Sequence, residues 1–393
     1  MTARHDVVVI GGGNAGISLA GRLRRLGARD VCVVAPDQDH LYRPLLNFVA
    51  GGQAPFDRLT KPMAEVLPGG CTWLPGRAVE VDPEAREVHV DSGERVGYTD
   101  VVVAPWLEPD LEATPGLAAA VERGWAPSSY LRHTAEATWE AVQGTEEGRV
   151  VFTVPPEPAP AGGTALKPLF LACDHWRERG VLDRVDVHLV TPFDSVLDLP
   201  FLDRRLEPHL ERFGVTVHHG ATVAALDPER RSVTLEAANG RRELDDVTWA
   251  SVVPRHVPPG WVAPLAGEGT GGLVDVDPET LVHRTLPRVW SLGDVANVRT
   301  RPSGGALRRQ VEILADNIQA ARKGRQLRRY DGYTVLPITV DRKRLLLAEF
   351  DRDGNPEPSI PVVDLTVPRR ALWVFDRYVE PVVYYRRLLK GKV

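Results

Sequence analysis

Three glycines near the start of the chain have the spacing of a turn that binds phosphate. Gly11, Gly13 and Gly16 form a GxGxxG pattern between an apolar run at 7–10, typical of a buried strand, and a helical repeat of apolar residues at 17–26. In such a strand–turn–helix, the first glycine permits the turn, the second admits a pyrophosphate and the third allows close packing. Free N–H groups at the helix start attract the anion. The pattern predicts a dinucleotide site; a glycine turn without a ligand is the alternative interpretation.

One acidic residue is expected to hold a ribose hydroxyl of such a ligand. A second apolar run, at 31–34, predicts the next strand, and an acid usually stands at its end, about 20 residues after the glycines. Ala35 occupies that position. Asp37 is therefore the nearest candidate for the ribose.

A second candidate binding point lies far along the chain. Gly293 and Asp294 follow an apolar run at 289–292 and precede a predicted helix at 305–321. There the backbone and a carboxylate can meet a sugar alcohol or a phosphate. An aspartate that only caps the helix is the alternative interpretation.

A second α/β unit begins with a strand at Arg149. The proline-rich turn PPEPAPAGGT follows, then a helix at 165–179 and a strand at 185–190. This is the order of a dinucleotide-binding half, but prolines lack the N–H groups that a phosphate cradle needs. We therefore expect no nicotinamide cofactor here. The unit continues with a helix and three strands, at 202–213, 215–218, 221–226 and 232–236, and closes near Pro254.

Composition excludes several classes of protein. The chain has 393 residues, 43% of them hydrophobic, which suffices for more than one domain. The net charge of −5 argues against general nucleic-acid binding. No apolar run reaches the roughly 18 residues of a membrane span, and a strand that starts by Asp6 leaves no room for a signal peptide. The three cysteines, Cys32, Cys71 and Cys173, have no metal-binding spacing and indicate a reducing compartment.

The last stretch, residues 369–393, is aromatic and basic. It holds seven Lys and Arg residues against two acids, Asp376 and Glu380, with aromatic residues interleaved. This composition favours a pair of interfacial helices, broken near Pro381, on an anionic membrane surface. A helix docked on the core or a dimer interface is the alternative, and a homo-oligomer is among the expectations.

Four stretches, in order over nearly the whole chain, carry a family resemblance: VVVIGGGNAG, DHLYRP, VDVDPETLVHRTLPRVWSLGDVANV, and YDGYTVLPITV with LLLAEFD. On these residues the chain resembles the sulfide:quinone oxidoreductases and the flavocytochrome c sulfide dehydrogenase flavoproteins. The resemblance implies an α/β fold with two Rossmann-like (FAD/NAD(P)-binding) domains and a C-terminal amphipathic, membrane-facing region. The expected FAD domain spans 1–105 and 285–325, a degenerate dinucleotide-binding-like domain spans 106–284, and the C-terminal strands and tail span 326–393. Within the first domain, residues 72–104 alternate in period two and predict a small antiparallel sheet.

The resemblance also implies roles for single residues. Noncovalently bound FAD would place its pyrophosphate at the three glycines, its ring near Tyr42 and Pro44, its ribityl chain at Asp294 and its isoalloxazine beside Pro337. A quinone would bind between the tail and the Pro337 loop. The expected location is cytoplasmic, on the inner face of the cell membrane. No catalytic residue is predicted.

The sequence departs from the family pattern at the residues that carry the sulfur chemistry. The family has a redox cysteine in the turn after the first strand of the second unit, but no cysteine occurs between Phe152 and Ala172. Its second redox cysteine precedes the proline of YTxCP, where this chain has Leu336. A further cysteine near 126–129 is also absent.

Further departures lie close to the expected cofactor. Ala35 replaces an acid, Ala104-Pro105-Trp106 replaces Ala-Thr-Gly, and RTRPSGG at 299–305 replaces a Thr-Ser-Lys segment. Arg299, Arg301 and Arg308 are the candidates to supply positive charge there. Three functions remain open. The first is a flavoenzyme that passes electrons to a quinone without a cysteine relay. The second is an NAD(P)H:quinone oxidoreductase, and the third is a degenerate, non-catalytic relative that acts as a binding or partner protein.

Overall fold

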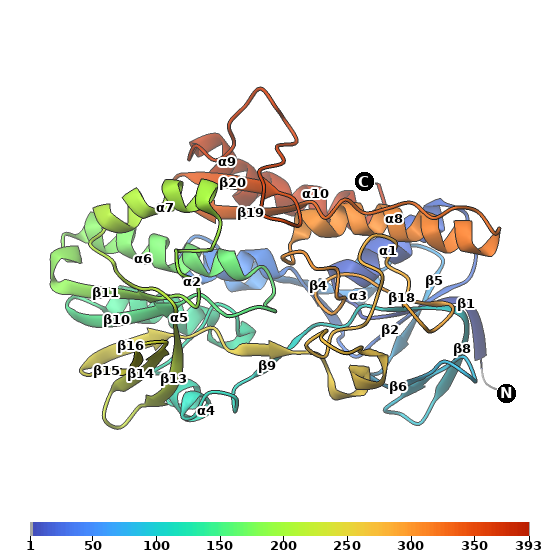
Figure 1. Cartoon of the computed structure of the whole chain (residues 1–393), viewed down its shortest axis with the longest axis horizontal. Helices are drawn as coiled ribbons and strands as arrows, with labels where there is room; N and C mark the ends of the chain where they lie inside the picture. Colours follow the sequence, from blue (N-terminus) through green and yellow to red (C-terminus); the bar gives the residue numbers. More distant parts are fainter. Residues whose placement is uncertain (1–2, 393) are drawn as a thin grey trace.

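The first α/β unit is built on a parallel sheet. The computed structural model describes residues 3–392, and Figure 1 shows this unit beside a second one. Its five parallel strands follow the order β5-β2-β1-β8-β18: β1 (Ala3–Ile10), β2 (Val31–Ala35), β5 (Cys71–Pro75), β8 (Arg95–Val103) and β18 (Val289–Ser291). β2, β8 and β18 are fully or largely buried and β1 is buried over its second half, which explains why the sequence shows them as apolar runs, whereas β5 is only partly buried.

The antiparallel part of this sheet is smaller than the sequence suggested. β6 (Ala78–Asp82) and β7 (Glu87–Val90) form a meander with β8, as the alternation predicts. β5 instead pairs parallel with β2, in the register Val31↔Cys71. The alternation of apolar and polar residues in β5 reflects its place at the edge of the sheet, where the strand is covered on one side only.

Two helices cover the site-bearing side of the first sheet. The predicted apolar positions of α1 (Asn14–Arg25), such as Ile17 and Leu23, are buried. α8 (Gly304–Arg322) packs beside it, and the Ser303 hydroxyl accepts a hydrogen bond from the N–H of Ala306. Both helices begin near the carboxyl ends of the parallel strands, where open α/β sheets bind their ligands.

The second unit has a parallel sheet of its own in the order β12-β11-β10-β16. Its strands are β10 (Gly148–Thr153), β11 (Val185–Val190), β12 (Thr216–His218) and β16 (Val247–Ser251). Two long helices cover it, α6 (Leu166–Arg179) and α7 (Pro200–Arg212). An antiparallel sheet adjoins it, made of β13 (Ala221–Asp227), β14 (Ser232–Ala237) and β15 (Gly240–Leu244), and the shorter helices are α4 (Leu117–Glu122) and α5 (Ala135–Gly144). This is a second Rossmann-like arrangement.

A short antiparallel pair, β9 (Glu108–Asp110) with β17 (Arg255–Val257), joins the two units where the chain leaves and re-enters the first. Two hydrophobic cores lie on either side of it. Residues such as Val262, Val274 and Leu281 belong to the first core. These residues, which the expected domain bounds assign to 106–284, therefore belong to the first core, in keeping with the expectation that the second unit closes near Pro254.

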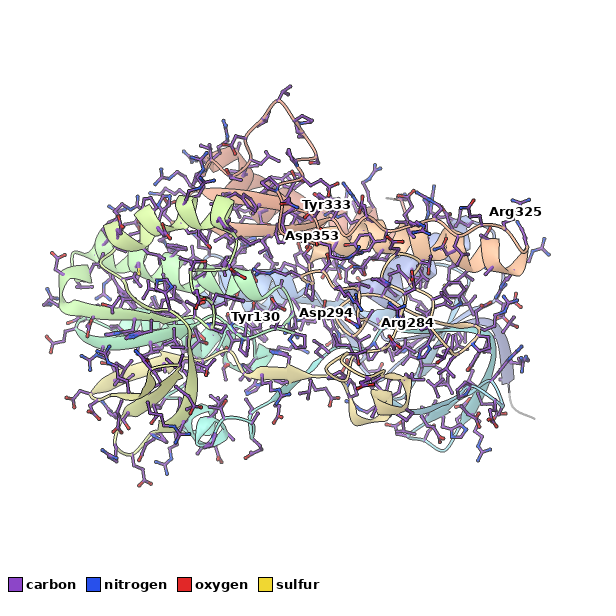
Figure 2. The ribbon with its side chains drawn as sticks, viewed as in Figure 1. Tyr130, Arg284, Asp294, Arg325, Tyr333 and Asp353 are labelled. Atoms are coloured by element: carbon purple, nitrogen blue, oxygen red, sulfur yellow. The ribbon has the colours of Figure 1, made fainter. Side chains whose placement is uncertain are left out.

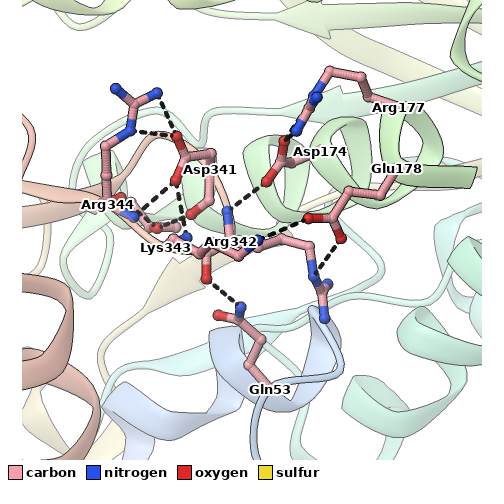
Figure 3. A network of polar contacts seen from close by, with 9 residues as sticks. Gln53, Asp174, Arg177, Glu178, Asp341, Arg342, Lys343 and Arg344 are labelled. Atoms are coloured by element: carbon pink, nitrogen blue, oxygen red, sulfur yellow. Dashed lines mark hydrogen bonds and ion pairs between the residues drawn. The ribbon is translucent and has the colours of Figure 1, made fainter. Parts of the chain in front are cut away.

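The C-terminal part bridges both units. The hairpin of β19 (Thr334–Thr339) and β20 (Leu345–Phe350) packs in the second core. Its turn is tied to α6 and to Gln53: the N–H of Arg342 donates to Asp174 Oδ2 (2.9 Å), and Gln53 Nε2 donates to the carbonyl of Arg342 (2.6 Å) (Figure 3). These contacts fix the position of Pro337.

The predicted tail is helical and does not break at Pro381. α9 (Arg370–Val374), a π-helix (Phe375–Val379) and α10 (Glu380–Arg386) follow without interruption. Pro381 stands in the first turn of α10, where its missing N–H costs least, and the wider π turn accommodates the change in hydrogen bonding. Within residues 3–392, no helix is long and apolar enough to cross a membrane. The remaining short elements are β3 (Asp39–Leu41), α2 (Leu46–Ala50), β4 (Thr60–Pro62) and α3 (Met63–Val66).

Candidate functional site

A cavity of about 520 Å³ lies between the two units. It is lined by the starts of α1 and α8, the end of β8, the turn at 160–164, β19 and the tail. Figure 2 labels Tyr130, Asp294 and Tyr333, which all line it. A cavity of this size accommodates a small organic ligand or cofactor.

The three glycines of the turn divide into two roles. Gly11 has φ +123°, and a Cβ there would lie 2.1 Å from the carbonyl oxygen of Ala104; a Cβ on Gly16 would lie 1.9 Å from that of Gly11. These two positions keep the turn packed against β8 and the helix. Only Gly13 lines the cavity, followed by Asn14 and Ala15. No side chain caps the start of α1, so its first N–H groups are available to an anion.

The indole of Trp106 lies directly over this turn. A Cβ added to Gly13 would be 2.7 Å from Trp106 Cζ2, so the ring fills the space next to the glycine. On its other side, the Arg43 guanidinium lies 5.0 Å from the centre of the indole. Gly12 is enclosed in the same way, because a Cβ there would be 2.6 Å from Met63 Cε and 2.7 Å from Ala35 Cβ.

Neither Ala35 nor Asp37 brings a carboxylate to the cavity at the end of β2, where a ribose would bind. Ala35 is buried, and its carbonyl accepts a hydrogen bond from Trp73 Nε1 (3.0 Å). Asp37 is exposed and does not line the cavity. The structure therefore separates this predicted site residue from the others.

Gly293 and Asp294 lie where the sequence analysis expected a second binding point. Gly293 has φ +78°, which lets the chain turn from β18 toward α8, and its N–H donates to Gln310 Oε1 (2.9 Å). The Asp294 carboxyl faces the cavity. Burial raises its pKa to about 6, and the charge of Arg43 offsets part of that effect. The carboxyl therefore changes charge close to neutral pH, within reach of a ligand hydroxyl.

Tyr42, Pro44 and Pro337, which the resemblance places beside a flavin ring, also line the cavity. Tyr42 is buried, and its ring centre lies 4.5 Å from that of Tyr384 in the tail. Tyr130 closes another wall and donates a hydrogen bond to the carbonyl of Ala161 (3.0 Å). The sequence analysis missed Tyr130, since no periodic pattern marks the loop that carries it.

Two ion pairs fasten the tail at the edge of the cavity. Lys167 Nζ lies 2.8 Å from Asp376 Oδ2, with side chains that are 2% and 11% exposed. Arg308 pairs with Glu380, and burial raises the pKa of that carboxyl. From the sequence, Arg308 was expected to supply charge near the cofactor, and Asp376 and Glu380 were noted as the acids of the tail. Their pairing was not predicted, because each pair joins segments far apart in the chain.

No thiol lines the cavity among the residues that the structure describes. Cys32 and Cys71 lie on β2 and β5, and burial raises their pKa values to about 12 and about 11. Cys173, in α6, is buried in the second core, and its pKa is also raised by burial. All three are therefore poor sources of thiolate.

The positions that replace the family's redox cysteines are apolar. Leu336 is buried, and a Cβ built on Gly163, in the turn that follows Ala161, would lie 2.8 Å from Leu336 Cδ1. The turn and β19 thus meet through hydrocarbon, and no sulfur is present at this contact.

Comparisons with known proteins agree with this architecture. Residues 5–138 match the model of the pyridine nucleotide-disulphide oxidoreductase family. The mitochondrial sulfide:quinone oxidoreductase of Mus musculus is 28% identical over 394 residues, which span 98% of this chain and 87% of that protein. The crystal structure of the sulfide:quinone oxidoreductase of Aquifex aeolicus has a TM-score of 0.81 at 17% identity and covers 100% of this chain and 92% of its own.

A further structural neighbour is a chain from a large mitochondrial assembly. A chain in the cryo-EM structure of the mitochondrial ATP synthase of Tetrahymena thermophila has a TM-score of 0.82 at 17% identity, with 100% of this chain and 97% of that chain covered. The comparisons confirm the predicted α/β fold with Rossmann-like units and the resemblance stated from the sequence.

Proposed function

We propose that this chain, a homologue of the sulfide:quinone oxidoreductases over nearly its whole length, is a flavin-dependent oxidoreductase that reduces a quinone. The observation that carries the proposal is the cavity itself. It combines an uncapped helix start at Gly13, the Asp294 carboxyl and the Pro337 loop in one space. A flavin needs these three features for its phosphate, its ribityl hydroxyls and its ring.

The residues around the cavity fit the ring-bearing end of a flavin. The helix start and Arg43 would bind phosphate, Asp294 would accept a hydrogen bond from a ribityl hydroxyl, and Tyr42 and Pro337 would lie beside the ring. When bound, the flavin supplies two-electron transfer. Since none of the described residues around the cavity is Cys or His, we propose that it is held noncovalently.

The electron donor in this proposal reaches the flavin without a cysteine relay. Attack by sulfide on a protein disulfide needs a pair of thiols, and Leu336 and the turn at 160–164 offer none. The role of the protein is therefore to orient the donor and the ring, and to exclude water with the apolar walls at Val335 and Tyr42.

The quinone would enter beside the tail. Five side chains on its outer side are each 40–52% exposed: Val374, Phe375, Tyr378, Val379 and Val382. Figure 1 shows the loop between β20 and α9 rising on the same side, and Val362 on that loop is 92% exposed. We propose that this outer surface of the tail rests on an anionic membrane, at the cytoplasmic face of the cell membrane.

A second candidate function is a binding or partner protein without catalysis. It is favoured by Trp106, which fills the space beside Gly13, and by Ala35 at the ribose position. An NAD(P)H:quinone oxidoreductase has less support, because the turn after β10 is rich in proline and lacks the N–H groups of a second phosphate cradle.

The test is flavin retention followed by electron transfer. The purified protein is incubated with flavin, desalted, reduced chemically without oxygen and mixed with a soluble quinone. We expect flavin absorbance to stay with the protein and the reduced flavin to be reoxidised by the quinone. Gly13→Val is the control, since its side chain would displace Trp106 into the cavity and should abolish retention. Wild-type protein that retains no flavin would favour the non-catalytic function.

A further inference from the structure

The route that a second nucleotide would take from the cavity is closed by side chains. Beyond Gly13, the path along the glycine turn toward the end of β2 meets Trp106, then Met63 and Ala35. The carbonyl of Gly12 is engaged as well, because it lies 2.8 Å from His40 Nδ1, and His40 Nε2 lies 2.6 Å from the Tyr384 hydroxyl. The side chains packed against Gly12 and Gly13 therefore occupy the space next to the turn that an adenosine arm would need.

Trp106 is held in this position from several sides. The N–H of Ala104 donates to the carbonyl of Ile10 (2.8 Å), so the chain before the tryptophan is fixed to the glycine turn. Leu107 is buried and leads into β9, which pairs with β17. Pro105 restricts the backbone between them. These contacts fix the backbone on both sides of Trp106, and its indole forms part of the cavity wall.

The anion-binding features on the cavity side of Trp106 remain open. Arg43 lines the cavity and makes no ion pair within 4.0 Å among residues 3–392; its hydrogen bond goes to the carbonyl of Tyr130 (3.3 Å). The uncapped N–H groups at the start of α1 face the same space. Together they provide for one phosphate group.

We propose that this site selects a flavin that carries a single phosphate, riboflavin 5′-phosphate, over FAD, with Trp106 excluding the adenosine arm. This inference rests on the proposed flavin-dependent function. Arg43 and the start of α1 hold the phosphate, and Asp294 holds the ribityl chain. The ring occupies the space beside Tyr42 and Pro337.

The experiment measures the affinity of the full chain, freed of ligand, for riboflavin 5′-phosphate, FAD and riboflavin by quenching of flavin fluorescence. We expect the monophosphate to bind at least about tenfold more tightly than either of the others. Trp106→Gly should strengthen FAD binding about tenfold and leave the monophosphate nearly unchanged. Trp106→Phe, which keeps an aromatic ring there, is the matched control and should retain the wild-type preference. Arg43→Gln should weaken the monophosphate and leave riboflavin unaffected.

The outcomes separate this inference from the proposed function. Wild-type protein that binds FAD as well as the monophosphate overturns the inference, while the flavin-dependent function stands. A Trp106→Gly variant that is folded by circular dichroism and gains no affinity for FAD also overturns it. If no flavin binds to the wild-type protein or to Trp106→Gly, both the inference and the proposed function fail.

Discussion

At the scale of single residues, Asp294 is a cavity-lining carboxyl that has Arg43 as a charged neighbour. Burial raises the pKa of Asp294 to about 6, so the folded protein holds this proton more tightly than the unfolded chain does. The contribution of this group to stability is fully present below about pH 4 and is lost as the pH rises through 6. Above neutral pH, the ionised carboxylate destabilises the protein without ligand.

We therefore expect Asp294→Asn to be more stable than the wild type at pH 8 by about 1–2 kcal/mol. The full shift corresponds to ~3 kcal/mol, and solvent in the cavity reduces it. Urea denaturation of the ligand-free protein at pH 4 and pH 8 measures the difference, which should vanish at the lower pH. A difference that is equal at both pH values would show that the charge of Asp294 is not its cause.

The thiols give a second prediction at this scale. We expect sulfide-dependent quinone reduction by the flavin-loaded protein to be slow, because Cys32, Cys71 and Cys173 are buried or protonated and lie outside the cavity. Changing all three to Ser should leave any residual rate within about twofold. If turnover is fast and stays fast in the triple variant, a cysteine relay is unnecessary. If turnover is fast in the wild type and is lost in the triple variant, one of these thiols takes part.

At the scale of elements, long periodic segments were predictable and short ones were not. The helices at α1 and α8 and the buried strands β1, β2 and β18 follow the sequence pattern within a few residues. β9 and β17 have three residues each, too few to show a period, and they exist because they pair across 144 residues of intervening chain.

The candidate site was predictable only in part. The glycine pattern and the Gly-Asp pair mark their own positions, because their chemistry is local. The replacement at Trp106 was visible in the sequence, yet the place of its indole against Gly13 depends on packing between two loops. The position of Asp37 was not predictable either, because its spacing from the glycines in the sequence does not reveal that its side chain is exposed to solvent.

The contact between α6 and the tail supplies a prediction for elements. Lys167 and Asp376 form a nearly buried ion pair, so Lys167→Met leaves the carboxylate without its partner. We expect a loss of about 3 kcal/mol in the free energy of unfolding. The double variant Lys167→Met with Asp376→Leu should recover most of it, since two apolar side chains can pack there. Urea denaturation of both variants measures the two free energies of unfolding. If the double variant loses as much stability as Lys167→Met, the packing of Lys167 matters and its charge does not.

At the scale of the whole molecule, the tail belongs to both the core and the surface. Tyr384, Leu388 and Leu389 are buried in the first core, whereas the outer side chains from Val374 to Val382 are exposed. Removing residues 368–393 would therefore unfold part of the first unit, so a test of membrane binding needs substitutions on the outer surface alone.

We expect the triple variant Tyr378→Ser, Val379→Ser and Val382→Ser to remain folded and to lose flotation with anionic liposomes. The wild type should float, less strongly as salt is raised, because each Arg near the surface contributes about 1 kcal/mol that salt screens. Val79→Ser is the control: Val79 is 45% exposed on β6, on the opposite side of the molecule (Figure 1). A triple variant that floats like the wild type would favour the tail as an ordinary docked helix.

The first unit is interrupted in the chain by the whole of the second, and this affects the order in which the protein forms during translation. β1, β2 and β8 leave the ribosome early, but β18, which pairs with β8, is made only after the second unit. Leu388 and Leu389, which pack against α1, come later still. The nascent chain thus carries an open sheet edge at the end of β8 while residues 104–288 are made, a state in which unpaired strands invite aggregation and recruit chaperones. The unit that is translated first is the last to be completed.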